Sequence, residues 1–390
     1  MISLLFLKQL LTIPVAIVSA VVKYYTTGTV YLTTNKEFAN SLYKNVHMSV
    51  LFHLANTYNR DDVATFIYRS TQSHFKKFKS HPLAVGLNGF GESIDPRTTW
   101  VVKNGSAAAS EKSAVLFLHG GGYCLNVFST QFIGIMALYY AVPEPEREKL
   151  SIAILDYSLT CHYKKFPTQI FEAIHAYREL VNQGYTKITL LGDSAGTNLA
   201  CAVARFIAYP EEAKATFSKF ADFDWDFSPL PQPENMIFIS PWLEPCTVPK
   251  YLPGVDTAGD LGAIDTSFGD WYVEGLNLDE IKPFVQFTNT TYEKHWANVD
   301  AFNGKGRCLY LYGAREILRE GVERFADIIT KEGLGKLEVY VEAGGIHDAL
   351  FYVESLDYLG KSGAQRALEG DFLSKFAYSL VGEFLAELVK

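Results

Sequence analysis

A serine between two glycines is the first feature of this sequence that could perform chemistry. Residues 192–196 read Gly-Asp-Ser-Ala-Gly; an apolar run ends at Leu191 and a helical pattern begins at Thr197. A nucleophilic serine needs a tight turn between a strand and a helix, and flanking glycines permit its strained backbone and the close approach of helix and strand. The pattern predicts that Ser194 is a nucleophile. The residues that support its turn are Gly192, Asp193 and Gly196.

Three consecutive glycines lie upstream of this serine. They follow His119 and the apolar run 114–118. Backbone N–H groups in such a loop can turn toward a developing oxyanion, together with the N–H of the residue after the nucleophile. A flexible glycine loop is the alternative interpretation, and the position upstream of the serine turn favours the first. The expected oxyanion hole comprises Gly120, Gly121, Gly122 and Ala195, with His119 in support.

A general base and an acid are expected downstream of the serine. His347 follows a predicted strand and lies in a loop, which fits the chain order serine, acid, histidine. The acid should follow a strand between the two, and Glu316 stands just after the predicted strand 308–312. The remaining candidates are His295 for the base, and Glu320 or Asp327 for the acid.

The elements that must position these residues alternate between β-rich and amphipathic runs. Strands are expected at 99–102, 114–118, 152–155, 188–191, 236–239, 309–312 and 337–341. Helical patterns cover 169–181, 197–209, 321–331 and 372–388. Most strand runs are continuously apolar, as in strands that helices cover on both faces. The alternation predicts an α/β protein with a mostly parallel sheet.

Two segments depart from this alternation. Residues 32–95 are polar and helical in tendency, and residues 245–300 are rich in Pro, Gly, Trp and Tyr. Inserted segments at the carboxyl ends of a parallel sheet usually cover the ligand crevice, so we expect both to contribute to a cap. Surface loops and packing helices are the alternative. The catalytic domain would then comprise residues 96–244 and 301–390.

Residues 1–31 are expected to form a separate, lipid-seeking segment. The first 22 residues carry one charge, Lys8, and are apolar enough to approach the length of a spanning helix. Three interpretations remain open: an uncleaved membrane anchor, a cleaved secretory signal, and an ordinary buried helix. The sequons at Asn104 and Asn289 would suit a lumenal or secreted domain, although about two are expected by chance in a chain of this length.

Composition excludes other classes of function. The formal net charge is −8 and no long Lys/Arg cluster occurs, so nucleic acid is not expected as a partner. The five cysteines are scattered and lack C-x-x-C spacing, which predicts neither a disulfide framework nor a zinc site. No P-loop, H-E-x-x-H or G-x-G-x-x-G motif is present, so we expect no metal and no cofactor.

Together these motifs resemble the hormone-sensitive-lipase-like branch of the α/β-hydrolases. The resemblance covers about residues 100 to 390 and rests on 119–122, 192–196, Asp156-Tyr157-Ser158-Leu159 with Phe166-Pro167, Ser240-Pro241-Trp242-Leu243, and 316–320. It implies an α/β-hydrolase fold and a serine esterase. Two departures stand out. The family usually has aspartate where Glu316 stands, and its Asp-Tyr-Arg-Leu-Ala-Pro-Glu motif is reduced to Asp-Tyr-Ser-Leu-Thr at 156–160.

The apolar N-terminus on such a domain also resembles the fungal steryl acetyl hydrolases, membrane-anchored enzymes that deacetylate sterol esters in the endoplasmic reticulum. This resemblance implies that the substrate is a small lipophilic ester with a short acyl group. It also implies that the protein lies in the endoplasmic reticulum membrane with its catalytic domain in the lumen; secretion is the alternative. The same residues would also serve a short-chain carboxylesterase, an acylglycerol lipase or a formamidase, and a non-catalytic receptor is the remote alternative. The sequence leaves the oligomeric state open.

Overall fold

The computed structural model describes residues 2–32, 34–55, 59–104, 112–261, 266–288, 295–331, 335 and 337–390. Its centre is a seven-stranded sheet with the strand order β1-β3-β2-β4-β5-β6-β7. Strand β1 pairs with β3 in antiparallel fashion and every other pairing is parallel. The strands are β1 (Thr98–Val102), β2 (Ser113–Leu118), β3 (Leu150–Leu155), β4 (Lys187–Asp193), β5 (Asn235–Ile239), β6 (Arg307–Gly313) and β7 (Glu338–Glu342). The mostly parallel sheet and its seven predicted strands are confirmed.

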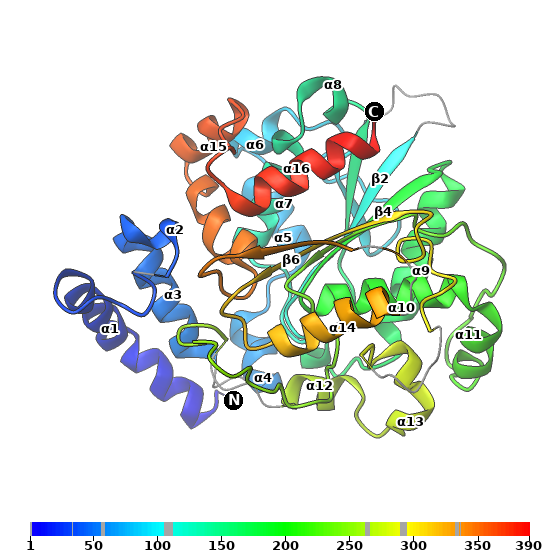
Figure 1. Cartoon of the computed structure of the whole chain (residues 1–390), viewed down its shortest axis with the longest axis horizontal. Coiled ribbons are helices and arrows are strands. Elements are labelled where there is room, and N and C mark those ends of the chain that lie inside the picture. Colours follow the sequence, from blue (N-terminus) through cyan, green and yellow to red (C-terminus); the bar gives the residue numbers. More distant parts are fainter. Residues whose placement is uncertain are drawn as a thin grey trace.

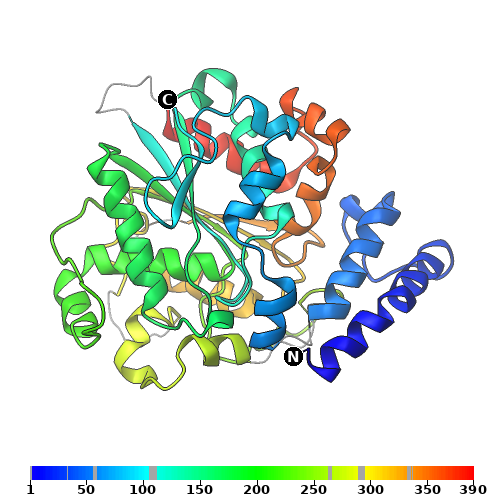
Figure 2. The ribbon, with the colours of Figure 1, turned by 180° about the vertical axis from the view of Figure 1, so that it is seen from behind.

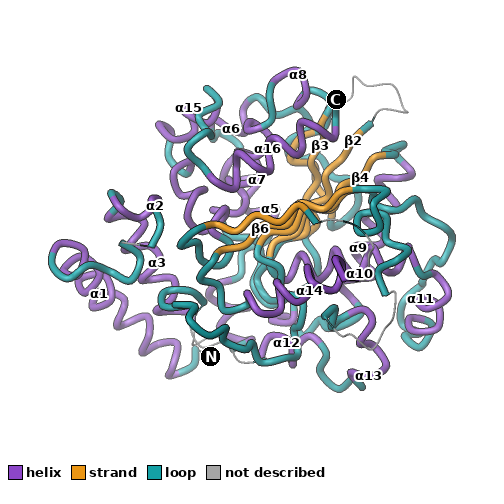
Figure 3. The backbone as a smooth tube through the Cα atoms, viewed as in Figure 1, coloured by secondary structure: helices purple, strands orange, loops and turns teal. Residues whose placement is uncertain are grey.

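Helices cover both faces of this sheet, as Figures 1 and 3 show. One face packs against α9 (Thr168–Asn182), α10 (Ala195–Ala208) and α14 (Arg319–Lys331), and the other against α7 (Ser129–Ala141), α15 (Lys361–Leu368) and α16 (Phe376–Leu388). Along β2, Leu116 contributes to the first core and Phe117 to the second. Both faces of the strand are therefore buried, which explains its continuous apolar sequence. Shorter helices are α8 (Glu144–Arg147) and α11 (Pro210–Phe217).

The helical pattern predicted over 372–388 begins later than expected. Helix α16 starts at Phe376, and its first backbone N–H groups donate to the buried carboxylate of Glu354, at 2.6 Å for Phe376 N. A carboxylate at a helix N-terminus satisfies donors that have no partner inside the helix. Glu354 thus sets the start of α16, and Phe372 lies in the preceding turn.

The N-terminal region forms a helical unit beside the sheet, visible in Figure 2 as two long helices that stand away from the body. Helix α1 (Leu4–Tyr25) packs along α3 (Leu42–Ala55), with α2 (Lys36–Ala39) between them in sequence. Ser3 caps α1 by accepting a hydrogen bond from Phe6 N at 3.1 Å. Among the described helices, α1 alone is long and apolar enough to cross a membrane. Much of its apolar surface is exposed, at Leu4, Leu11, Val15, Val18 and Val22.

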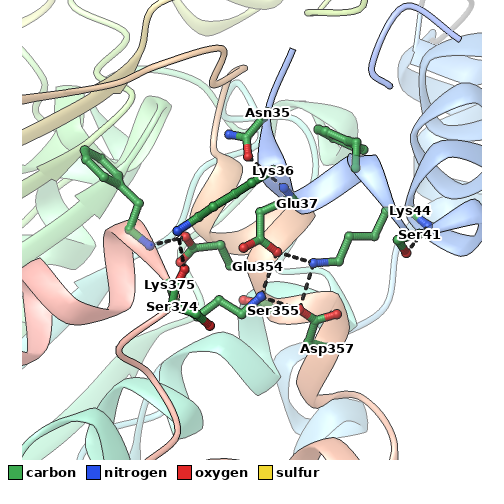
Figure 4. A network of polar contacts seen from close by, with 12 residues as sticks. Asn35, Lys36, Glu37, Ser41, Lys44, Glu354, Ser355, Asp357, Ser374 and Lys375 are labelled. Carbon is green, nitrogen blue, oxygen red and sulfur yellow. Dashed lines mark hydrogen bonds and ion pairs between the residues drawn. The ribbon is translucent and has the colours of Figure 1, made fainter. Parts of the chain in front are cut away.

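Four charged side chains fasten this unit to the catalytic domain (Figure 4). Lys44 and Lys375 each contact both Glu37 and Asp357, and all four contacts lie within 2.8 Å. Lys44 is almost fully buried. Glu37 and Lys44 of the N-terminal unit therefore form ion pairs with Lys375 and Asp357 of the C-terminal third of the chain. We call these four side chains the charge cluster.

The rest of the segment 32–95 contains α4 (Arg60–Asp62), α5 (Thr71–Phe78) and α6 (Pro82–Val85). Phe75 and Phe78 of α5 and Leu83 of α6 belong to the core that covers the second face of the sheet. This part of the segment therefore matches the packing-helix alternative. The described part of segment 245–300 contains α12 (Ser267–Tyr272) and α13 (Leu278–Ile281).

Candidate active site

Ser194 occupies the turn between β4 and α10, with φ 49° and ψ −115°. Its N–H donates to Ile239 O of the neighbouring strand at 2.9 Å. A Cβ on Gly196 would lie 1.8 Å from Leu118 O, and one on Gly192 would lie 2.6 Å from the backbone of Gly196. Both positions therefore require glycine, because the start of the helix touches the ends of two strands. This geometry is that of the strained turn predicted for a nucleophilic serine.

The glycine loop lies beside this turn and is tied to it by Asp193. Gly120 N–H donates to Asp193 Oδ1 at 2.8 Å, and Gln131 Nε2 donates to Asp193 Oδ2 at 2.7 Å. Burial raises the pKa of Asp193 to about 6. The expectation that Gly120 serves the oxyanion hole is therefore wrong, because its N–H group already has a partner.

The other predicted oxyanion donors have no acceptor among the described residues. Gly121 and Gly122 have φ values of 110° and 60°, which glycine adopts without strain. In the described part of the chain, the amide groups of Gly121, Gly122 and Ala195 have no hydrogen-bond acceptor. Three unpaired N–H groups thus remain beside the serine.

Tyr157, the second residue of the reduced Asp-Tyr-Ser-Leu-Thr motif, contacts the glycine loop. Its hydroxyl donates to His119 O at 2.6 Å, and its ring stacks on the imidazole with 4.1 Å between centroids. Burial lowers the pKa of His119 to about 4, so the ring is neutral at pH 7. Asp156 Oδ1 accepts a hydrogen bond from Asn126 at 3.0 Å. The shortened motif therefore keeps the contact that supports the loop.

Glu316 and His347 meet at the carboxyl ends of β6 and β7. Glu316 Oε2 lies 3.4 Å from His347 Nδ1. Glu316 Oε1 accepts hydrogen bonds from Gly313 N and from Ser240 Oγ, both at 2.6 Å. Ser240 Oγ in turn accepts from Asp348 N at 2.9 Å. The carboxylate is thus oriented on one side by Ser240 and presents its other oxygen to the imidazole, as an orienting acid must.

A second carboxylate lies at the other ring nitrogen of His347. Asp348 Oδ2 is 3.3 Å from His347 Nε2. Burial by itself lowers the pKa of His347, but the charges of Asp348, Glu316 and Asp260 outweigh it and raise the pKa to about 10. No hydrogen bond joins Ser194 Oγ to His347 among the described residues. Catalytic hydrogen bonds are often long in structures without substrate and tighten in the complex.

The other candidates for base and acid lie elsewhere. Glu320 and Asp327 are on α14, where they pair with Arg324 at 3.2 Å and with Lys331 at 3.1 Å. The ring of His295 packs edge-on against Trp296, and burial lowers the pKa of His295 to about 2. Of the three candidate acids, Glu316 is the one that contacts His347.

The segment 245–300 touches this site at its oxyanion side. The ring of Phe268 packs so closely on the loop that a Cβ on Gly122 would lie 2.2 Å from it. The rings of Tyr272 and Tyr123 stack with 3.9 Å between centroids. These contacts support the interpretation of this segment as a cap.

Sequence reasoning missed several polar residues of the site. Ser240 belongs to the Ser-Pro-Trp-Leu motif, whose resemblance to a family assigns it no role, and Asp348 directly follows the histidine. Gln131 and Asp260 carry no signal in the sequence, since their positions depend on the tertiary fold. In the described residues, no group of three or more His, Cys, Asp and Glu side chains is arranged to hold a metal ion.

The two sequons have different outcomes. Asn104 is buried, and its Nδ2 lies within 3.0 Å of three oxygen atoms, those of Tyr139 Oη, Arg147 O and Leu150 O. A folded protein with this contact set cannot carry a glycan at Asn104, which argues against the expected modification. Asn289 lies outside the described residues.

Comparisons with known proteins identify one matching family and several relatives. The family described as steryl acetyl hydrolase matches residues 4–361. The steryl acetyl hydrolase homologue mug81 of Schizosaccharomyces pombe is 27% identical over 370 residues, which cover 91% of this chain and 92% of that protein. Steryl acetyl hydrolase 1 of Saccharomyces cerevisiae is 26% identical over 215 residues, 52% of this chain and 45% of that protein.

Solved structures show the same fold. A bacterial esterase of the hormone-sensitive lipase family superposes with a TM-score of 0.57 at 19% identity, covering 88% of this chain and 98% of its own. An esterase/lipase from an uncultured bacterium superposes with a TM-score of 0.51 over the same shares of the two chains. The fold of this chain is therefore the α/β-hydrolase fold, as expected.

Proposed function

Because the chain belongs to the steryl acetyl hydrolase family and is a carboxylic ester hydrolase, we propose that it cleaves its ester through Ser194, His347 and Glu316. The observation that carries this proposal is the contact between Glu316 and His347 beyond the carboxyl ends of β6 and β7, at the same edge of the sheet as the turn that bears Ser194. Ser194 follows β4 on a strained turn, and the amide groups of Gly121, Gly122 and Ala195 have no acceptor in the described part of the chain.

The proposed reaction has two acyl-transfer steps. Ser194 Oγ attacks the ester carbonyl carbon while His347 Nε2 takes the hydroxyl proton, and Glu316 stabilises the imidazolium through Nδ1–H. The carbonyl oxygen becomes an oxyanion, for which Gly121, Gly122 and Ala195 supply N–H donors. His347 then protonates the leaving alcohol. Water attacks the acyl-enzyme with the same histidine as base, which releases the acid and restores Ser194.

Labelling with a fluorophosphonate tests the nucleophile directly. We expect wild-type protein to be labelled and the Ser194→Ala variant to remain unlabelled. Ser218→Ala, which removes an exposed serine at the end of α11, is the matched control and should label as wild type does. Labelling of Ser194→Ala at the wild-type rate would show that another residue is the nucleophile.

The substrate we propose is a steryl acetate, a lipophilic ester with a small acyl group. The family match and the apolar helix α1 support this choice. Purified protein should release acetate from steryl acetate and from p-nitrophenyl acetate, with falling kcat/KM as the acyl chain lengthens to octanoyl. Faster hydrolysis of triacylglycerols or of an N-formyl amide would instead assign a lipase or a formamidase, since the fold supports each of these reactions.

We also propose that α1 holds the enzyme in the endoplasmic reticulum membrane with the catalytic domain in the lumen. The exposed apolar surface of α1 supports membrane association. Replacing Leu11 and Val15 together by glutamate should release the protein on carbonate extraction, whereas the same change at the exposed Val248 and Tyr251 should not. In sealed microsomes the catalytic domain should resist added protease; its digestion would contradict the lumenal orientation.

A further inference from the structure

Asp260 joins the two loops that carry the acid and the base. Its Oδ2 accepts the N–H of Ile317, the residue after Glu316, and its Oδ1 accepts the N–H of His347, both at 2.7 Å. The side chain is 1% exposed, so these contacts are shielded from water. The two oxygens of one carboxylate thus span two loops that follow different strands.

The loop that carries Asp260 is itself held in place. Arg315 donates to the backbone oxygens of Asp256 and Ala258, at 2.9 and 2.6 Å, and to the Asp256 carboxylate at 2.8 Å. Gly259 has φ 83°, and a Cβ there would lie 2.6 Å from the ring of Tyr31. The loop is therefore wedged between the acid loop and the N-terminal unit.

We infer that Asp260 is a positioning residue, which fixes the separation between Glu316 and His347 so that their contact can form. The inference rests on the proposed roles of these two residues. Beyond the paired strands, backbone hydrogen bonds still join the two loops, from Ala314 N–H to Glu342 O at 2.9 Å and from Arg315 N–H to Gly345 O at 3.0 Å, but these bonds end before Glu316 and His347. Asp260 extends this connection to the residues that matter, because its ionised carboxylate accepts the N–H groups of Ile317 and His347, and hydrogen bonds to a charged acceptor are stronger than neutral ones.

A purely structural role is the rival explanation. Asp260 comes from the segment 245–300, so its bonds also attach this segment to the catalytic domain. A structural role predicts a loss of stability with normal kinetics in the molecules that remain folded. A positioning role predicts a loss in kcat, because a displacement of about 1 Å between catalytic groups can cost about 100-fold in rate.

The test compares Asp260→Asn with Asp256→Asn, using p-nitrophenyl acetate as the substrate. An asparagine has one acceptor oxygen, so it can keep one of the two backbone bonds. We expect kcat to fall about 10- to 100-fold in Asp260→Asn, with KM within about twofold of wild type. Asp256→Asn should keep the wild-type kcat, because two backbone oxygens still hold that loop to Arg315. Wild-type kcat in folded Asp260→Asn would overturn the inference.

Asp260→Glu keeps the test decisive if the asparagine variant does not fold. Glutamate retains both acceptor oxygens and the charge, but it is longer by one methylene and would push the loops apart. We expect folded Asp260→Glu, checked by circular dichroism, to show a reduced kcat and slower labelling by fluorophosphonate. A wild-type kcat in this variant would also overturn the inference. Failure of the proposed function would look different, since Ser194→Ala would then retain activity.

Discussion

The carboxylate of Asp348 lies 3.3 Å from Nε2 of His347, the ring nitrogen that does not face Glu316. A general base must offer this nitrogen to the serine hydroxyl in its neutral form. The negative charge of Asp348 favours the imidazolium, while burial raises the pKa of Asp348 and so opposes the ionised form that makes this contact. For His347 to act as the base, Nε2 has to face Ser194 Oγ in place of Asp348.

Replacing Asp348 by asparagine should shift the pH dependence of activity. Loss of a negative charge beside the ring lowers the pKa of His347 from its value of about 10, so the neutral base becomes available at lower pH. The acid limb of kcat/KM against pH should move down by about one to two units. Asp371→Asn, at an exposed ion pair, should leave the limb in place. An unchanged limb in Asp348→Asn would contradict the charge pair.

Glu316→Gln should remove most of the activity. Glutamine cannot stabilise the imidazolium as a carboxylate does, and comparable changes of an orienting acid cost about 10⁴ in kcat. The matched control is Glu320→Gln, four residues on, whose carboxylate pairs with Arg324. Steady-state kinetics on p-nitrophenyl acetate distinguishes the two. Equal losses in both variants would argue against Glu316 as the acid.

The fold was predictable because its signals are local. Most strands of the sheet are short apolar runs between turn residues, and burial on both faces makes the run continuous, as at Leu116 and Phe117 of β2; the edge strand β7 is largely exposed. The start of α16 was not predictable, since it is set by Glu354, 22 residues away in sequence.

The site divides in the same way. Ser194 and the glycine loop are recognisable because each depends on neighbours within a few residues. The partner of Gly120 N–H could not be foreseen, because it is the side chain of Asp193, 73 residues downstream. Asp260 likewise acts on loops 57 and 87 residues away. Contacts across such separations leave no local pattern in one sequence.

Gly121→Ala should lower kcat without abolishing the fold. A Cβ at this position would lie 2.5 Å from Leu125 O, and the φ of 110° is strained for alanine, so the oxyanion loop must move. Loss of one oxyanion donor costs about 10²- to 10³-fold in kcat. Gly184→Ala is a matched control, with φ 86° and no atom within 4 Å of the new Cβ. It should cost about 1 kcal/mol in stability and leave kcat unchanged.

Lys44→Met should destabilise the protein strongly through the charge cluster. The variant leaves Glu37 and Asp357 with Lys375 as their shared cation, and loss of one partner of a buried pair costs about 3–5 kcal/mol. Urea unfolding in detergent should report a lower midpoint. Lys331→Met, at an exposed pair on α14, should unfold at the wild-type midpoint. Similar midpoints for the two variants would contradict the buried character of the cluster.

The N-terminal unit also packs directly against the histidine loop. Tyr31, Phe38 and Met48 form a small apolar core with Ile346 and Ala349, which lie one residue before and two residues after His347. A soluble enzyme should therefore be obtained by trimming the chain near Gly28, after α1, where this core stays intact. Trimming to residue 96, the predicted start of the catalytic domain, would leave Ile346 uncovered and the histidine without its support. The shortest active fragment should thus include residues 29–95 in addition to the predicted catalytic domain.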